Sequence, residues 1–174
     1  MGKNIILTGF MGTGKSTVGT KIAERLNRRF VDMDREIEKL TGMTISELFR
    51  RYGEVRFRSE EKLMAKKIAV QDDLVVATGG GIVLDQENIE LLKRNGIIVC
   101  LVADPEEIFK RVSRKKGTRP LLKKNLTVDD IIAMLEERKP FYEQAEIIIQ
   151  TNGRNIDTVV DDIIKKLSQE PGAL

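Results

Sequence analysis

A phosphate-binding motif near the amino terminus limits this chain to a small group of folds. Residues 9–16 are Gly-Phe-Met-Gly-Thr-Gly-Lys-Ser, which matches the P-loop pattern GxxxxGK[ST]. The motif follows an apolar run at Asn4–Thr8 and opens an amphipathic stretch at Lys15–Leu26. The backbone N–H groups of such a strand–loop–helix turn converge on a polyphosphate, and the helix dipole adds positive charge there. The motif therefore predicts a nucleotide-binding α/β domain.

Each position of the motif has an expected task. The glycines allow close approach of the backbone, the lysine reaches the β- and γ-phosphates, and the serine hydroxyl can ligate Mg²⁺. A switch GTPase would also be expected to show a guanine-reading NKxD element, and the sequence contains none, so ATP is the expected nucleotide. We expect six residues to contact it: Gly12, Thr13, Gly14, Lys15, Ser16 and Thr17.

The rest of the chain alternates short β-branched runs with longer amphipathic stretches, the pattern of βαβ units. Strands are predicted at Asn4–Thr8, Arg29–Met33, Leu74–Thr78, Ile97–Val102 and Glu146–Gln150. Helices are predicted at Lys15–Leu26, Arg35–Leu40, Ile45–Gln71, Gln86–Arg94, Pro105–Arg114, Val128–Arg138 and Ile156–Leu167. Apolar strands of this kind are buried on both faces, which predicts a three-layer α/β/α fold of the P-loop kinase type with a five-stranded parallel sheet.

Composition narrows the functional classes. The 174 residues suit a single domain, with no apolar run long enough for a membrane span, and we expect a cytoplasmic monomer. The absence of histidine excludes histidine-based catalysis and histidine metal sites. The lone Cys100 lies in an apolar run and is expected in the core. A net charge of +3 with 5% aromatic residues does not favour nucleic-acid binding.

Two carboxylates follow the second predicted strand. The carboxyl end of that strand should lie beside the P-loop, where ligands of parallel sheets bind. Asp32 and Asp34 are two residues apart, so continued strand geometry would point both to one side. One could then hold Mg²⁺ and the other could orient or deprotonate an acceptor hydroxyl. The alternative is that Asp34 merely caps the helix predicted to begin at Arg35.

Two further segments are expected to be poorly packed. Lys115–Asn125 is basic, contains Gly117 and Pro120, and lies between two predicted helices, so we expect a mobile lid over the site. The tail Gln169–Leu174 is expected to be frayed.

Over nearly its whole length the chain resembles shikimate kinase. The resemblance rests on the P-loop and on five further motifs in the family's order and spacing: Asp32-x-Asp34, Phe57-Arg58 with Glu61, Thr78-Gly79-Gly80-Gly81, Arg119-Pro120-Leu121-Leu122 and Arg138-x-Pro140-x-Tyr142. It implies ATP- and Mg²⁺-dependent phosphorylation of the shikimate 3-hydroxyl in aromatic amino-acid biosynthesis.

The resemblance also implies roles for the acceptor site. By this resemblance Asp34 would contact the hydroxyls of shikimate, which makes it the expected catalytic base. Asp32 would help to hold Mg²⁺ through a water molecule. Arg58 and Arg138 would grip the shikimate carboxylate, which suits arginine because its planar fork forms two parallel hydrogen bonds. Gly79–Gly81 would line the same pocket, and a ligand pressed against bare backbone would explain three consecutive glycines.

On the nucleotide side the resemblance is less complete. Arg119 matches a lid arginine that moves onto the phosphates, where it would act in catalysis with Lys15. Arg111 matches an arginine packed against adenine, but its spacing to Arg119 is one residue longer than usual, so Arg114 stays an alternative. Arg154 matches a residue of an adenine-side loop, although the proline that often follows is absent.

Two other functions remain open at this point. Another small-molecule P-loop kinase could act on gluconate, which also carries a carboxylate, or on a nucleoside monophosphate. A nucleotide-dependent binding module without catalysis is the alternative from a different class. The presence of Lys15, Ser16, Asp32, Asp34 and Arg119 argues against it, because such a module needs no complete catalytic set.

Overall fold

The computed structural model describes residues 2–114 and 125–174. Within them a five-stranded parallel sheet has the order β2-β3-β1-β4-β5. The strands are β1 (Asn4–Thr8), β2 (Arg29–Asp32), β3 (Leu74–Ala77), β4 (Gly96–Val102) and β5 (Ile147–Gln150). The helices are α1 (Lys15–Leu26), α2 (Met33–Thr41), α3 (Ile45–Ala69), α4 (Gln86–Lys93), α5 (Pro105–Ser113), α6 (Val128–Tyr142) and α7 (Ile156–Leu167), with a short 3₁₀ helix η1 at Ile82–Leu84.

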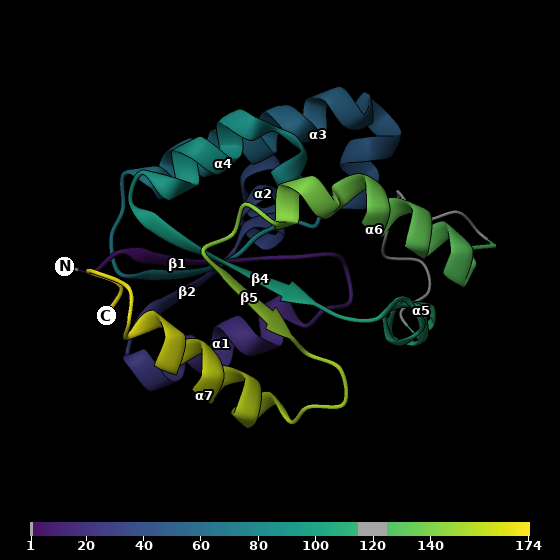
Figure 1. Cartoon of the computed structure of the whole chain (residues 1–174). Helices are drawn as coiled ribbons and strands as arrows, with labels where there is room; N and C mark the ends of the chain where they lie inside the picture. Colours follow the sequence, from purple (N-terminus) through teal and green to yellow (C-terminus); the bar gives the residue numbers. More distant parts are fainter. Residues whose placement is uncertain (1, 115–124) are drawn as a thin grey trace.

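Alternate side chains of the central strands supply two hydrophobic cores. Ile5 and Leu7 of β1 pack with α1 and α7 on one face, whereas Ile6 packs on the opposite face with residues of α3 and α4. Figure 1 shows α1 and α7 below the sheet and α3, α4 and α6 above it. The predicted three-layer α/β/α fold with a parallel sheet is confirmed. Cys100 is fully buried in the core, and burial raises the pKa of its thiol to about 12, as expected for a packing residue.

Several predicted boundaries shift for local reasons. The helix predicted at Arg35 begins at Met33, because the side chain of Asp32 accepts a hydrogen bond from the Arg35 backbone N–H and caps the helix. Asp34 is therefore not the cap. The long helix predicted as one unit is broken at Gly53, whose φ of 78° and ψ of 179° are not helical.

The last helix-boundary correction matters for the site. Helix α6 continues past Arg138, includes Pro140 and ends at Tyr142. Because residues four apart lie on the same face of a helix, Tyr142 comes to lie next to Arg138.

The tail does not fray as expected. The carbonyl of Gly172 accepts from the Lys3 N–H at 2.8 Å, and the Arg28 guanidinium donates to the Ala173 carbonyl at 2.9 Å. The Ala173 side chain is fully buried in the core cluster that the sheet forms with α1 and α7. The end of the chain is thus held beside the amino terminus, an interaction between distant residues that composition does not reveal.

Candidate functional site

A cavity of about 950 Å³ opens at the carboxyl ends of β1, β2 and β3, the edge of a parallel sheet where ligands bind. Its walls contain every predicted site residue that lies in the described part of the chain: Gly12, Thr13, Gly14, Lys15, Ser16, Thr17, Asp32, Asp34, Arg58, Gly79, Gly80, Gly81, Arg111, Arg138 and Arg154. Arg119 and the predicted lid at 115–125, apart from Asn125, lie outside the described residues.

The P-loop forms the phosphate end of this cavity. Gly14 has a left-handed φ of 96° directly before α1, so only glycine fits there without strain. Gly12 packs against α5, where a β-carbon would come within 3.2 Å of the Val112 side chain. The Lys15 ammonium donates to the carbonyls of Gly9 and Phe10, at 2.8 and 3.0 Å. The lysine is thereby folded over the loop whose N–H groups would surround a phosphate.

Ser16 and Asp32 meet at the base of the loop. The Ser16 hydroxyl donates to Asp32 Oδ2 at 2.8 Å, although the two residues are 16 positions apart. A hydroxyl and a carboxylate at one point are oxygen donors of the kind that Mg²⁺ prefers. No group of three acidic, cysteine or histidine ligands occurs among residues 2–114 and 125–174, so these side chains could provide only part of a metal's coordination.

Asp34 lies deeper in the cavity than Asp32. The prediction that strand geometry would point both side chains to one side is wrong, because the strand ends at Asp32 and Asp34 is in the first turn of α2. Burial raises the pKa of Asp34 to about 6, the nearby Asp32 charge adds to the rise, and Lys15 opposes it. Its Oδ1 atom is buried and accepts no hydrogen bond from any described residue. This oxygen is thus an acceptor that has no donor among the described residues.

Arg58 is held by two acidic residues of its own helix. Its guanidinium contacts Glu61 at 2.7 Å and Glu54 at 2.9 Å. Glu61 is 1% exposed, and burial raises its pKa to about 7 even though Arg58 acts against the rise. The sequence places Glu61 in one of the family motifs but does not indicate a role for it. Its position three residues after Arg58 was the available signal, because such pairs share a helix face.

Arg138 reaches the cavity from a different helix, α6. It is 7% exposed, and its guanidinium donates to the Gly80 carbonyl at 3.1 Å. The Tyr142 hydroxyl donates to the same carbonyl at 3.2 Å. The structure therefore brings Arg58 and Arg138, 80 positions apart in sequence, to one cavity that also contains Asp34.

The expected reason for two of the three glycines needs correction. A β-carbon at Gly79 would lie 2.9 Å from Asp34 Oδ1 and 3.0 Å from Glu61 Oε1, and one at Gly81 would lie 2.5 Å from the Arg58 guanidinium. The space over these two glycines is therefore taken by protein side chains, where sequence reasoning expected a ligand. Bare backbone here admits the charged groups of the site.

Three arginines surround the nucleotide end. Arg111 donates to the Gly12 carbonyl at 3.1 Å and to Glu107 at 2.8 Å, so it is tied to the P-loop. Arg114 also lines the cavity, and the alternative between it and Arg111 as the adenine contact stays open. Arg154 pairs with Asp162 at 2.5 Å and donates to the Gln150 carbonyl.

Comparison with known proteins assigns the family. The sequence model of the family described as "Shikimate kinase" matches residues 11–168. The chain is 49% identical to the shikimate kinase of Pelotomaculum thermopropionicum over 167 residues, which cover 96% of each protein. This chain belongs to the shikimate kinase family. The shikimate kinase of Thermus thermophilus is 42% identical over 163 residues, 94% of this chain and 89% of the relative.

Solved structures agree with the assignment. The shikimate kinase from Acinetobacter baumannii in complex with shikimate superposes with a TM-score of 0.91 at 38% identity, over 97% of this chain and 95% of that one. A gluconokinase from Sinorhizobium meliloti matches with a TM-score of 0.62 at 17% identity, over 96% of this chain and 92% of that one, a likeness of fold alone. None of the helices in the described part has the length and apolar character of a membrane span.

Proposed function

We propose that this shikimate kinase family member transfers the γ-phosphoryl group of ATP to the 3-hydroxyl of shikimate, giving shikimate 3-phosphate and ADP in aromatic amino-acid biosynthesis. The observation that carries the proposal is the combination of groups in one cavity. A P-loop, one buried and one partly buried arginine, and an unpartnered carboxylate oxygen are what a kinase for a hydroxylated carboxylic acid requires. A related shikimate kinase, solved in complex with shikimate, shares the whole fold.

At the phosphate end, the residues position and neutralise the nucleotide. Phosphoryl transfer depends mainly on alignment and on charge neutralisation at the oxygens of the transferring group. The N–H groups of Gly12 to Thr17 would hold the β- and γ-phosphates, and Lys15 would exchange its two backbone carbonyls for phosphate oxygens. Arg111 and Arg154 would bound the adenine side.

Ser16 and Asp32 would hold Mg²⁺, Asp32 through a water molecule. When bound, the ion neutralises charge on the β- and γ-phosphate oxygens. The 2.8 Å contact between the serine hydroxyl and the carboxylate brings both oxygen donors to one side of the P-loop.

At the acceptor end, Asp34 would bind the reacting hydroxyl and take its proton. Its Oδ1 atom accepts no hydrogen bond from the described residues, and its raised pKa of about 6 brings it close to the range of an effective general base. Arg58 and Arg138 would bind the carboxylate of shikimate and so fix the ring with one hydroxyl towards Asp34.

We propose further that residues 1–174 form one kinase domain that works as a cytoplasmic monomer. All the groups named above belong to one chain, and the single reduced cysteine fits a reducing compartment. Residues 115–125 would close as a lid and bring Arg119 to the phosphates.

The substrate series shikimate, shikimate methyl ester, gluconate and AMP tests the function by ADP release. Loss of the carboxylate charge leaves Arg138 without an anion and removes one contact of Arg58, so the ester should show a kcat/KM at least about a hundredfold lower. Gluconate should react poorly, because its flexible chain does not hold a hydroxyl at Asp34. Equal rates for acid and ester would refute the carboxylate grip, and a preference for gluconate or AMP would transfer the assignment to those kinases.

A further inference from the structure

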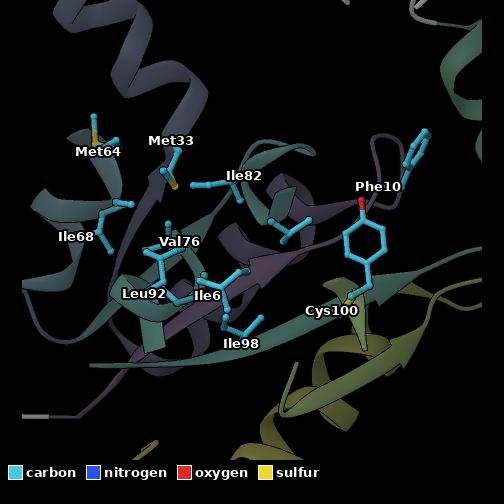
Figure 2. Close-up of a cluster of buried hydrophobic side chains, with 14 of the residues drawn as sticks. Ile6, Phe10, Met33, Met64, Ile68, Val76, Ile82, Leu92, Ile98 and Cys100 are labelled. Atoms are coloured by element: carbon cyan, nitrogen blue, oxygen red, sulfur yellow. The ribbon is translucent and has the colours of Figure 1, made fainter. Parts of the chain in front are cut away.

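The P-loop carries an aromatic side chain that takes no part in phosphate binding. Phe10, the second residue of the motif, is 1% exposed and belongs to the core cluster that also contains Cys100 and Tyr142. Figure 2 shows Phe10 at one end of this cluster, well away from Met64 and Ile68. A buried residue of a phosphate loop that points into the core can connect the loop with whatever packs on its ring.

The group on the ring is the guanidinium of Arg138. Its Cζ atom lies 5.0 Å from the centroid of the Phe10 ring, within the range of a cation–π interaction. The hydrogen bond to the Gly80 carbonyl is the second contact of the same guanidinium, at 3.1 Å. The Phe10 ring, the Gly80 carbonyl and the adjacent Tyr142 hydroxyl, all of them neutral, thus fix the position of a largely buried cation.

The two arginines of the acceptor site are held in different ways. Arg58 forms ion pairs with Glu54 and Glu61, which offset part of its positive charge. Arg138 forms no ion pair with any described residue, so its full charge stays available to an incoming anion. A ring orients a cation through its quadrupole and leaves the charge in place, whereas a carboxylate partner would compete with a substrate carboxylate.

The P-loop also meets the backbone of the glycine loop after β3, Gly79–Gly81, which we call the acceptor loop. A β-carbon at Gly80 would lie 3.4 Å from the backbone nitrogen of Met11 and 3.8 Å from the Gly9 carbonyl oxygen. Gly80 therefore packs directly on the P-loop residues that flank Phe10. Its carbonyl accepts hydrogen bonds from both Arg138 and Tyr142. The P-loop, Gly80 and Arg138 are thus connected by direct contacts.

We propose that Phe10 is a positioning residue for Arg138, and that the P-loop thereby sets the carboxylate grip of the acceptor site as well as the phosphate cradle. The proposal rests on the proposed function, because it takes the anion bound by Arg138 to be the carboxylate of shikimate. Phe10 touches neither substrate in this scheme and acts through the arginine alone.

The test replaces the ring and keeps the bulk. In Phe10→Leu the KM for shikimate should rise about tenfold, the effect of losing a desolvated cation–π contact, while the KM for ATP stays within about twofold. The preference for shikimate over its methyl ester should fall by a similar factor, because a misplaced Arg138 gains less from the carboxylate. Phe141→Leu is the matched control: it is the same substitution on the helix that carries Arg138, in a partly buried side chain outside the cavity. It should leave the acid-to-ester preference unchanged.

A double-mutant comparison separates positioning from general damage to the loop. If Phe10 acts through Arg138, Phe10→Leu should cause little further loss in shikimate affinity when Arg138→Met is already present. The same loss in both backgrounds, or an equal rise in the KM values for ATP and shikimate, would overturn the proposal. A wild-type enzyme that does not use shikimate would instead refute the proposed function, so the two failures are distinct.

Discussion

The two ends of the cavity are built in opposite ways. At the phosphate end, contacts are local: Lys15 is held by carbonyls five and six residues away in the same loop. At the acceptor end, charges come from helices far apart in the sequence, with Asp34 on α2, Arg58 and Glu61 on α3 and Arg138 on α6. The phosphate cradle is thus encoded by one contiguous motif, whereas the acceptor site exists only after the helices have packed.

The electrostatic consequences differ as well. A P-loop binds anions with backbone N–H groups and a helix dipole. These groups are neutral, so the protein without ligand has no charged side chain to bury at that place. The acceptor end buries carboxylates at a cost, which raises the pKa of Asp34 to about 6 and that of Glu61 to about 7. At the acceptor end, the buried carboxylates that the reaction needs therefore lower the stability of the fold. At the phosphate end there is no such conflict.

The largest expected effect is on kcat, from a substitution that changes the acceptor end of the cavity and leaves the phosphate end intact. Asp34→Asn keeps the shape of the side chain and removes the base, so kcat should fall by at least about a hundredfold. The affinity for an ATP analogue, measured by calorimetry, should change by less than about twofold, because the P-loop contacts are local. Near-normal turnover in this variant would remove Asp34 from the catalytic role.

A smaller effect, on the KM for shikimate, is expected from a substitution at Gly81, where the Arg58 guanidinium packs on the backbone. In Gly81→Ala the new β-carbon would lie 2.5 Å from the guanidinium, so Arg58 must move and the KM for shikimate should rise about tenfold. Ser59→Ala is the control, because this exposed side chain follows Arg58 on α3 and lies outside the cavity, so the KM should not change. A KM for Gly81→Ala within about twofold of the wild-type value would mean that the bare backbone at this position does not serve the arginine.

The same contrast explains what could be predicted from the sequence. The P-loop, its strand and its helix were located without error, because a local motif specifies a local structure. The acceptor residues could be identified through the family resemblance, but the geometry of the site could not be predicted. Asp32 is a helix cap, and Gly79 and Gly81 make room for side chains. Tertiary contacts decide both points.

Residues that act through others were the hardest to find. Glu61 and Tyr142 each follow an arginine at helical spacing, a pattern that equally suits an exposed helix face. Phe10 occupies a position that the P-loop pattern leaves free. The packing of the tail at Gly172 and Ala173 could not be predicted for a different reason, because its partners Lys3 and Arg28 are distant in sequence.

The smallest expected effect concerns stability and follows from the raised pKa of Asp34. Between the ordinary aspartate pKa of 3.8 and the raised pKa of about 6, the folded protein holds a proton that the unfolded chain has lost, so the free energy of unfolding should fall as pH rises through this window. The carboxylate is partly exposed, so we expect a loss on the order of 1 kcal/mol. Asp34→Asn removes the titration and should therefore match the wild type at pH 4 and exceed its stability at pH 8. Denaturant unfolding of both proteins at the two pH values measures the difference, and Glu90→Gln, which neutralises an exposed carboxylate of α4, is the control that should show little change. A variant that is less stable than the wild type at pH 8 would mean that the charged form of Asp34 stabilises the fold, and the conflict between chemistry and stability at the acceptor end would not exist.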